Sequence, residues 1–367
     1  MLSRAMELSN DPGGNYLISP ISIQMALGMC ATGSDPDTAT RKELMQVLFP
    51  GGGDDPAVLN EEMATFAERM KESRVASWNV ANSIWVNDNG RVKLRDSYIR
   101  DASNYYKAEL FQAPFDAGTV KAINQWVKEN TRERIPEILN DLSPEARIAL
   151  VNALAFDGEW AEQYEESQVD ENGKFTNAGG EEKTVAMLSS TEYRAMKLAG
   201  GVGFIKPYKG GQYTFVGILP PEGMSTADYM KKIAEDPTSF AEAYRSPEYT
   251  DVYVNMPEFK VEYGSVLNDL LLSLGVQEAY SDDAHFRTMV ADDSLPVKIG
   301  TVIHKTMIEV DRHGTKAAAA TAVVMDQAEA LPVDQPIYVN LDRPFIYAIV
   351  DDASGVPVFL GAQNSMD

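Results

Sequence analysis

Apolar residues recur every three or four positions through much of the first third of the chain. This spacing places them on one face of a helix and predicts helices over Thr38–Leu48, Ala57–Ser73 and Val120–Leu139. Pro20 favours a further helix starting there, because a proline in the first helical turn removes no needed N–H. Pro136 predicts a break or kink near the end of the third helix. The first third is therefore expected to be mainly helical.

The rest of the chain carries the short apolar runs typical of strands. One of them is almost wholly apolar, as in a strand covered on both faces, and Gly210-Gly211 predicts a hairpin between two others. Strands are expected at Ile148–Phe156, Gly203–Tyr208, Gln212–Leu219, Val252–Val254, Lys260–Tyr263, Val302–Val310, Ile337–Leu341, Phe345–Val350 and Val356–Leu360, and a helix at Ser265–Leu274. Strand and helix do not alternate regularly, so the pattern predicts an α+β fold with several mostly antiparallel sheets.

Composition narrows the class of protein. The chain has 367 residues, of which 44% are hydrophobic, and a net charge of −23. Nucleic acids and anionic membranes both attract clustered cations, so this charge argues against either partner. Cys30 is the only cysteine, which excludes an internal disulfide and favours a buried structural thiol. No apolar run reaches the roughly 18 residues of a membrane helix.

No catalytic or metal-binding constellation stands out. His285, His304 and His313 lack the spacing of zinc ligands, and there is no cysteine pair. A Gly-x-Ser-x-Gly elbow is absent, and Gly201-Val202-Gly203 lacks the third glycine of a dinucleotide fingerprint. The sequence therefore supports no enzyme, no metal site and no cofactor.

The most unusual stretch is the apolar connection from Gly314 to Pro336, between two predicted strands. A connection of more than 20 residues is uncommon in a compact domain and is often functional. Its alanines favour a helix. If the segment is instead a strand, in which alternate residues share a face, its two charges, Lys316 and Asp326, fall on the same face. The uncharged face holds Thr315, Ala317, Ala319, Thr321, Val323 and Met325. A strand with one buried face needs this pattern, so the loop has the composition of a strand and could become one.

Five segments carry a recognisable signature. They are Asn15–Ser22, Val151–Ala153, Gly158–Trp160, His304–Asp311 and Val339–Tyr347. In this order and at these spacings the chain resembles the serpins, the serine protease inhibitor family, and in particular its inhibitory members. The likeness runs from about Asn15 to Gln363.

The resemblance implies a serpin fold with one domain over residues 1–367. Three β-sheets, eight or nine helices and an exposed reactive-centre loop at about 314–336 are expected. In this family a target protease cleaves the loop and forms an acyl-enzyme. The cut loop then inserts as a new central strand of sheet A, which drags the protease along and distorts it. The implied function is irreversible, suicide-type inhibition of serine proteases.

The resemblance also implies a hinge at the start of the loop, where inhibitory members have small residues. The hinge residues are Gly314, Thr315, Lys316, Ala317, Ala318, Ala319, Ala320 and Thr321. Two positions depart from the family. Arg312 replaces the usual glutamate three residues before Thr315, and Lys316 replaces the glutamate that often follows it. These charge reversals put the rate of insertion in question more than the mechanism.

A set of polar residues matches the family's shutter and breach, the cluster beneath the strands that open. Ser19, Ser22, Asn152 and His304 match this cluster, and Trp160 matches the breach tryptophan. Any core requires its buried polar groups to be hydrogen-bonded, and Trp160 could be a plain core aromatic. The structural and functional interpretations are compatible.

The family's spacing also locates the reactive bond. Counting 14 residues from the hinge glycine gives Ala328-Glu329, with Ala328 in the primary pocket of the protease. A small apolar residue suits elastase-like enzymes. Glu329 as the primary residue would instead suit a Glu-selective protease. Leu331 precedes a proline, which resists cleavage, and cutting at Val324 or Met325 would leave a shorter strand to insert.

The leading hypothesis is thus a suicide inhibitor of serine proteases with elastase-like preference, acting as a monomer. The alternative is a non-inhibitory serpin that serves as a binding, carrier or chaperone module, which the hinge composition disfavours. An inhibitor must meet its protease, so we expect a secreted protein whose export signal is absent from this chain. A cytoplasmic location is the alternative.

Overall fold

The computed structural model describes residues 1–9, 11–72, 76–87, 92–291, 297–315 and 336–366. Contacts divide the chain into two interleaved compact units. The first unit contains Met1–Ser19, Phe156–Tyr263 and Ile308–Asp367, and the second contains Pro20–Ala155 and Gly264–Met307.

In the described part of the first unit, nine strands form one hydrogen-bonded sheet. Their order is β1-β15-β14-β8-β7-β6-β9-β13, with β5 also paired to β6. The strands are β1 (Tyr16–Ile18), β5 (Val169–Thr176), β6 (Glu182–Leu198), β7 (Gly201–Pro207), β8 (Tyr213–Leu219), β9 (Glu248–Pro257), β13 (Ile337–Asn340), β14 (Phe345–Asp351) and β15 (Val356–Gln363). The helices are α1 (Leu2–Ser9), η1 (Glu166–Gln168), α7 (Thr226–Ala234) and α8 (Ser239–Arg245).

The long strand β6 joins what would otherwise be two sheets. Its residues 187–195 pair with β9, and residues 195–198 pair with β7. Two of the three sheets implied by the family resemblance are therefore joined into one continuous hydrogen-bonded sheet. The hairpin predicted between β7 and β8 is confirmed, and Gly210 and Gly211 adopt the positive φ angles, +82° and +66°, that favour glycine. The α+β architecture is likewise confirmed.

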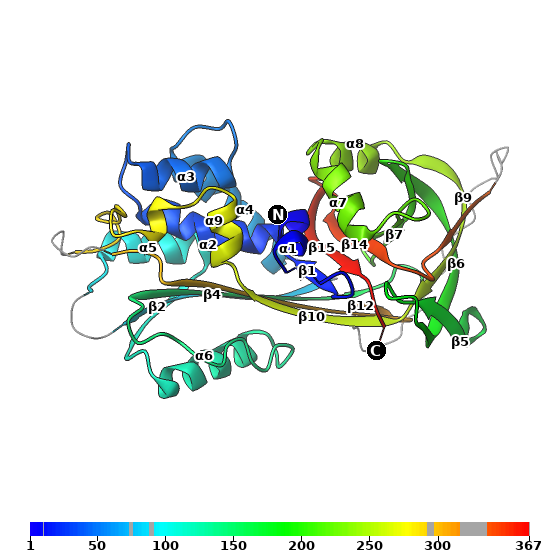
Figure 1. Cartoon of the computed structure of the whole chain (residues 1–367), viewed down its shortest axis with the longest axis horizontal. Helices are drawn as coiled ribbons and strands as arrows, with labels where there is room; N and C mark the ends of the chain where they lie inside the picture. The colour runs from blue at the N-terminus through cyan, green and yellow to red at the C-terminus, as the bar shows by residue number, and fades with distance from the viewer. Residues whose placement is uncertain (10, 73–75, 88–91, 292–296, 316–335, 367) are drawn as a thin grey trace. The chain divides into compact units, whose positions relative to one another are not determined.

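In the second unit, helices cover both faces of a set of strands (Figure 1). α6 (Ala117–Asn130) lies on one face of β2 (Ala76–Asn87) and β4 (Ile148–Glu159), and α2 (Pro20–Gly33) lies on the other. The other elements here are α3 (Ala39–Leu48), α4 (Pro56–Glu72), α5 (Asp96–Tyr106), β3 (Glu109–Ala113), α9 (Asn268–Ser273) and η2 (Glu278–Tyr280). The strand β2 is one that the apolar pattern of the first third did not predict.

Three strands belong partly to each unit: β4, β10 (Phe259–Val266) and β11 (Thr301–Asp311). Within the second unit β4 and β11 pair in parallel, from Ala149 with Thr301 to Ala155 with Met307. β10 continues to Val266, so the helix expected at Ser265–Leu274 is confined to α9.

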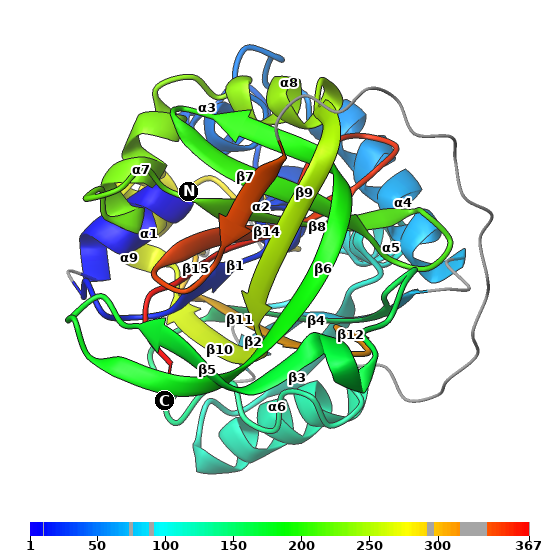
Figure 2. The same ribbon diagram turned by 90° about the vertical axis from the view of Figure 1, so that its right-hand side faces the viewer.

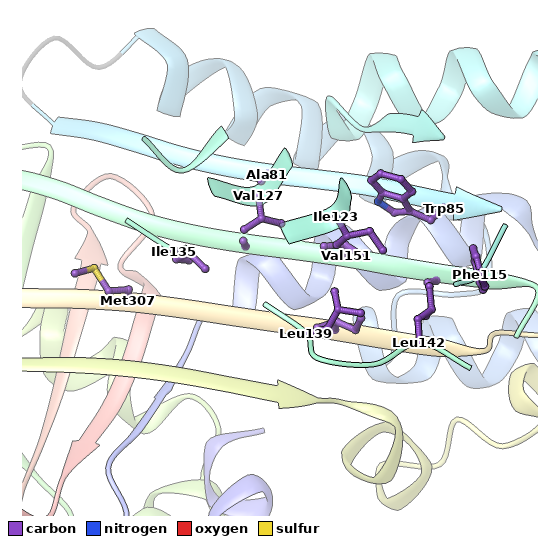
Figure 3. Packing of buried hydrophobic residues seen from close by; sticks show 13 residues of the cluster. Ala81, Trp85, Phe115, Ile123, Val127, Ile135, Leu139, Leu142, Val151 and Met307 are labelled. Atoms are coloured by element: carbon purple, nitrogen blue, oxygen red, sulfur yellow. The ribbon is translucent and has the colours of Figure 1, made fainter. Parts of the chain in front are cut away.

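The core of the second unit lies between α6 and the strands (Figure 3). Ile123 and Val127 of α6 pack in one cluster with Ala149, Val151 and Ala153 of β4. Successive side chains of a strand point to opposite faces. The odd-numbered residues of β4 therefore face α6, and the even-numbered ones face the opposite side.

The helix expected over Val120–Leu139 is shorter than predicted, because α6 ends at Asn130. Two residues with φ angles of +49° and +63° follow and turn the chain back. The Asn124 side chain then accepts the backbone N–H of Leu139 at 3.2 Å, which holds the returning segment against α6. Ile135 and Leu139 are buried in the same cluster. Their burial explains why a non-helical segment carried helix-like apolar spacing.

Cys30 lies buried in α2, as expected of a structural thiol, and burial raises the pKa of its sulfur. Among the described residues, no helix combines the length and the apolar character needed to cross a membrane.

Candidate functional site

A two-residue strand, β12 (Gly314–Thr315), lies between β4 and β11 in the first unit. Thr315 pairs with Gly158 of β4 on one side and with Val310 of β11 on the other. Gly314 continues both pairings. The first two residues of the predicted hinge therefore already form the start of a central strand.

The turn that leads into β12 requires glycine at its end. Gly314 has a φ of +155°, and a Cβ atom there would lie 2.1 Å from the carbonyl oxygen of Gly158. Asp311 closes the turn, since its Oδ1 accepts the N–H groups of His313 at 2.7 Å and of Gly314 at 3.0 Å. Any larger residue at this position would push the hinge away from β4.

Thr315 is fully buried. Its Oγ1 lies 2.5 Å from the hydroxyl oxygen of Tyr208. The Tyr208 ring stacks on Trp160 with 4.6 Å between ring centroids, and Trp160 Nε1 donates to the carbonyl of Asp311 at 2.8 Å. Burial raises the pKa of Tyr208, so its hydroxyl stays protonated. The predicted breach residue Trp160 thus contacts the residues that hold the hinge.

A buried ion pair lies beside these rings. Lys206 Nζ is 2.8 Å from Glu192 Oε1, and the two side chains are only 4% and 9% exposed. The Lys206 ammonium also lies 4.6 Å from the ring centroid of Tyr164, a cation–π distance. Burial acts to lower the pKa of Lys206, but the electrostatic influence of Tyr164 and Glu192 outweighs it, and the pKa is raised. The lysine therefore stays charged.

Sequence reasoning missed four residues of this site. They are Tyr164, Glu192, Lys206 and Tyr208. A lysine at the end of the apolar run that forms β7 was the one available signal, because a charge inside such a run needs a buried partner.

Arg312, which reverses the charge usual in the family, is paired with two acids. Its Nε and Nη2 donate to the two carboxylate oxygens of Glu258 at 2.8 and 3.2 Å, and Nη2 also donates to Glu171 at 2.9 Å. Glu258 in addition accepts the backbone N–H of Arg312 at 3.0 Å. These hydrogen bonds raise the pKa of Arg312. The unusual arginine is therefore locally compensated.

A second polar cluster lies in the second unit, on the face of β4 opposite α6. Ser22 of α2 donates to Asn152 Oδ1, and Asn152 Nδ2 donates to Asn82 of β2. His304 Nδ1 is 2.9 Å from the same Asn152 oxygen, which only accepts, so the ring carries its proton on Nδ1. Three predicted shutter residues are thus hydrogen-bonded together, and Asn82 joins them. Ser19 is also buried.

The buried His304 predicts a specific loss of stability in acid. Burial lowers its pKa to about 3, whereas the unfolded chain titrates near 6.5. Between these values only the unfolded state binds the proton, so stability is complete above about pH 6.5 and falls below it. The loss is about 2 kcal/mol at pH 5. Denaturant midpoints of wild type and His304→Gln at pH 7.5 and 5 measure it. Equal losses in both proteins would contradict this assignment.

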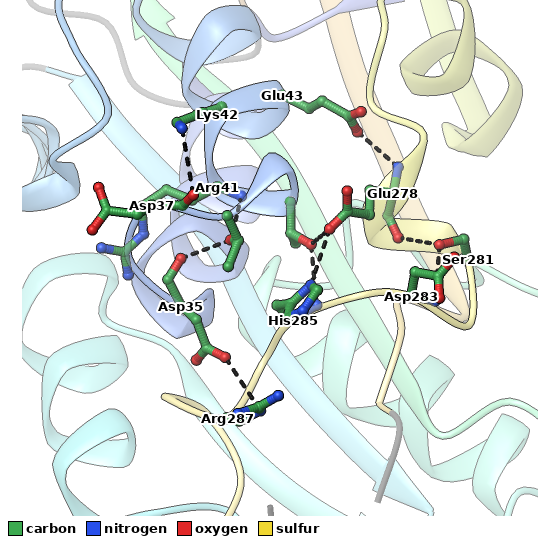
Figure 4. A network of polar contacts seen from close by, with 12 residues as sticks. Asp35, Asp37, Arg41, Lys42, Glu43, Glu278, Ser281, Asp283, His285 and Arg287 are labelled. Carbon is green, nitrogen blue, oxygen red and sulfur yellow. Dashed lines mark hydrogen bonds and ion pairs between the residues drawn. The ribbon is translucent and has the colours of Figure 1, made fainter.

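The other two histidines have structural contacts. His285 Nδ1 and Thr40 Oγ1 each lie 3.0 Å from Glu278 Oε1, in a polar network that joins α3 to η2 (Figure 4). Burial acts to raise the pKa of Glu278, but these hydrogen bonds outweigh it and lower the pKa. His313 accepts the N–H of Trp160 through its backbone carbonyl. Within the described ranges, no group of His, Cys, Asp and Glu side chains is arranged to hold a metal ion.

Part of the predicted site lies outside the described residues. This applies to hinge residues Lys316, Ala317, Ala318, Ala319, Ala320 and Thr321 and to the reactive bond Ala328-Glu329. Their roles stay predictions.

Comparisons with known proteins give the family. The model of the family described as "Serpin (serine protease inhibitor)" matches residues 2–366. Antitrypsin from Bombyx mori is 29% identical over 361 residues, covering 96% of this chain and 89% of that protein. The thermophilic serpin tengpin in its native state has a TM-score of 0.89 and 36% identity, covering 100% of this chain and 92% of that one. In its latent state tengpin scores 0.83 at 33% identity, covering 100% and 96%. The chain therefore belongs to the serpin family.

Proposed function

We propose that this serpin is an irreversible, suicide-type inhibitor of serine proteases with elastase-like preference. It acts by loop cleavage at Ala328-Glu329, acyl-enzyme trapping and insertion of the cut loop between β4 and β11. The observation that carries the proposal is β12, since Gly314 and Thr315 already pair with both strands. A loop that has begun to enter a sheet needs only its downstream end released to continue.

The register of the strands supports continued entry. Partners on β4 and β11 differ by a constant 152 in residue number, from Ala149 with Thr301 to Ala155 with Met307. Gly158 and Val310 keep the same offset, and Thr315 pairs with both. The loop can therefore advance one residue at a time without a change of register. In that register Thr321 would come between Asn152 and His304 and replace their hydrogen bond.

The same register matches the face pattern of the loop. Thr315 is buried, and every second residue after it, through Met325, is uncharged and would share its face. Lys316 would come between Asp157 of β4 and Glu309 of β11, two carboxylates of opposite charge to it. The lysine that departs from the family pattern would thus meet favourable charges.

Charges are also complementary at the far end of the gap between β4 and β11 that the loop would fill, which we call the slot. Asp326 would come beside Arg147, whose Nη1 is buried without a hydrogen-bond partner among the described residues. Met325 would reach Ile148, where β4 begins. A loop cut after Ala328 keeps Asp326 and can bring it beside Arg147, whereas one cut after Val324 or Met325 lacks Asp326, which favours the Ala328 bond.

Incubation with pancreatic elastase tests the proposal. We expect a covalent complex that survives SDS, together with release of a C-terminal fragment that begins at Glu329, identified by mass spectrometry. Cleavage without a complex would favour the non-inhibitory alternative. A fragment that begins elsewhere would reassign the reactive bond.

A further inference from the structure

A cavity lies where β11 begins, between the segment 138–143 and the strands β10 and β11. We call it the seam cavity. Its volume is about 460 Å³, which is within the usual range for small-molecule sites. Ile303 of β11 lines the cavity and also packs in the cluster with α6, so the cavity is on the α6 side of the sheet. Figure 2, like Figure 1, shows α6 on one side of β4 and β11.

One wall of the seam cavity is fixed to β4 and its neighbours. This wall is the segment 138–143, which leads through Ala146 into β4. Asn124 of α6 donates to the carbonyl of Leu139 at 2.8 Å. Asn87, the last residue of β2, donates to the carbonyl of Ala146 at 2.9 Å. The wall therefore belongs to the block formed by β2, β4 and α6.

The floor of the seam cavity belongs to a different block. Val266 of β10 and Ile303 of β11 form part of this floor. Asn268 lies just after β10, and its Nδ2 donates to the carbonyl of Gly300 at 2.9 Å. Its Oδ1 accepts the N–H of Val302 at 3.0 Å. The end of β10 and the start of β11 are therefore held together independently of β4.

The proposed loop insertion would separate these two blocks at the cavity. Here β4 and β11 pair directly, beginning with Ala149 and Thr301. The N–H of Gly300 also donates to the carbonyl of Ile148 at 3.1 Å. A strand inserted between them doubles their spacing from about 4.8 Å to about 9.6 Å. Filling the slot to its far end would therefore draw the wall of the cavity away from its floor.

The lining combines apolar surface with a single charge. Ile138, Leu142 and Val266 contribute apolar side chains. Among the described residues that line the cavity, Asp141 is the only one with an ionisable side chain, and it has no ion-pair partner within the described ranges. The net charge of −23 adds a negative potential that attracts cations. A ligand with an apolar body and one ammonium group complements this lining.

We propose that the seam cavity binds a small organic monocation and that the bound ligand restrains insertion of the reactive-centre loop. The restraint rests on the proposed function, whereas the binding does not. A ligand that contacts both wall and floor loses contacts when β4 and β11 separate, so it binds the closed sheet more tightly. This difference in affinity shifts the balance toward the closed sheet. Bound ligand therefore delays insertion and gives hydrolysis of the acyl bond more time.

Calorimetry with tryptamine, an indole that carries one ammonium group, tests the binding. Tryptophol has a neutral hydroxyl in place of the ammonium and isolates the effect of charge. We expect wild type to bind tryptamine about fivefold more tightly than tryptophol, the most that one partly exposed ion pair contributes. Asp141→Asn should bind the two compounds equally. Glu145→Gln removes an exposed acid of the same segment outside the lining, and it should keep the wild-type preference.

Two outcomes of this calorimetry would overturn the proposal. One is equal affinity of wild type for the two compounds, which includes a failure to bind either. The other is a preference for tryptamine that persists in Asp141→Asn.

A cavity-filling variant locates the ligand. A Cβ atom at Gly264 of β10 would have its nearest contacts at 3.4 Å, with the flexible side chain of Lys305, which shares the face of Ile303. Gly264→Val therefore adds volume to the floor without a backbone clash, and valine suits a strand. We expect this variant to lose tryptamine binding while its denaturant midpoint stays near that of wild type. Wild-type affinity in the variant would place the ligand elsewhere and overturn the proposal.

The restraint is tested by comparing intact wild type with protein cut near Ala328. We expect tryptamine to bind the cut form about tenfold more weakly, a usual size for coupling between two sites. Equal affinity for a cut form whose Tm has risen would overturn the restraint. If cleavage leaves Tm unchanged, the proposed insertion and the restraint are both wrong, and the calorimetry of the variants alone decides the binding site.

Inhibition of pancreatic elastase gives a second measure of the restraint. Saturating tryptamine should raise the stoichiometry of inhibition of wild type, because more acyl-enzyme is hydrolysed before the loop inserts. Gly264→Val should show no such change, which controls for any effect of tryptamine on elastase itself. The same stoichiometry with and without tryptamine in wild type would contradict the restraint.

Discussion

Thr315→Arg is expected to convert this serpin from a trap into a substrate of its target protease. Thr315 is fully buried and pairs with Gly158 of β4 and Val310 of β11. Its hydroxyl is hydrogen-bonded to the hydroxyl of Tyr208. An arginine at this position would place an unpaired charge among the aromatic rings of the breach, at a cost on the order of several kcal/mol. Insertion would then lose its competition with hydrolysis of the acyl bond, and cleaved inhibitor would accumulate with free protease.

The stoichiometry of inhibition and the yield of SDS-stable complex measure this effect. Thr315→Ser is the matched control, because it keeps a hydroxyl within reach of Tyr208 and adds no volume. We expect the serine variant to trap protease nearly as well as wild type. If the arginine variant traps protease as efficiently as wild type, the proposal that the loop inserts between β4 and β11, starting at β12, is wrong.

Cutting the loop near Ala328 is expected to raise the thermal stability of the whole protein. The severed segment would form hydrogen bonds to both β4 and β11 and bury its uncharged face. For a chain of this length each kcal/mol gained raises Tm by roughly 1–2 °C. A gain of about 10 kcal/mol would therefore raise Tm by about 10 °C or more.

Limited proteolysis followed by calorimetry makes the measurement, with the cut site checked by mass spectrometry. The cut Thr315→Arg variant is the control: burying its arginine offsets several kcal/mol of the gain, so cleavage should raise its Tm clearly less than that of wild type. An unchanged Tm after cleavage of wild type would show that the cut loop does not insert into the sheet and stabilise the protein.

Much of the fold follows from local pattern. The hairpin at Gly210-Gly211 and the strand β11 were predicted because alternation, turn residues and runs of β-branched residues act over a few positions. The helix over Val120–Leu139 was predicted too long, since Ile135 and Leu139 are buried by a chain reversal that keeps helix-like spacing. Local pattern detects burial, but it does not distinguish the geometries that achieve it.

The shutter residues also include some that the sequence revealed and some that only the structure revealed. Ser22, Asn152 and His304 came from the family resemblance, and the structure brings them together. Asn82 escaped notice, because an asparagine in a strand has no sequence feature that marks it as buried. Lys206 and Glu192 are 14 positions apart in sequence, and only the pairing of β6 with β7 makes them neighbours.

The α+β class and the small-residue loop whose alternate positions lack charge could be predicted from the sequence, because they depend on composition and on spacing along the chain. The family followed from the resemblance of short motifs, which are also local features. The pairing of Gly314 and Thr315 between β4 and β11, and the ion pairs of Arg312 with Glu258 and Glu171, became visible only in the folded protein. Strand register and ion pairing join residues that are distant along the chain. Their free energy depends on where the backbone carries them, and no local window contains that information.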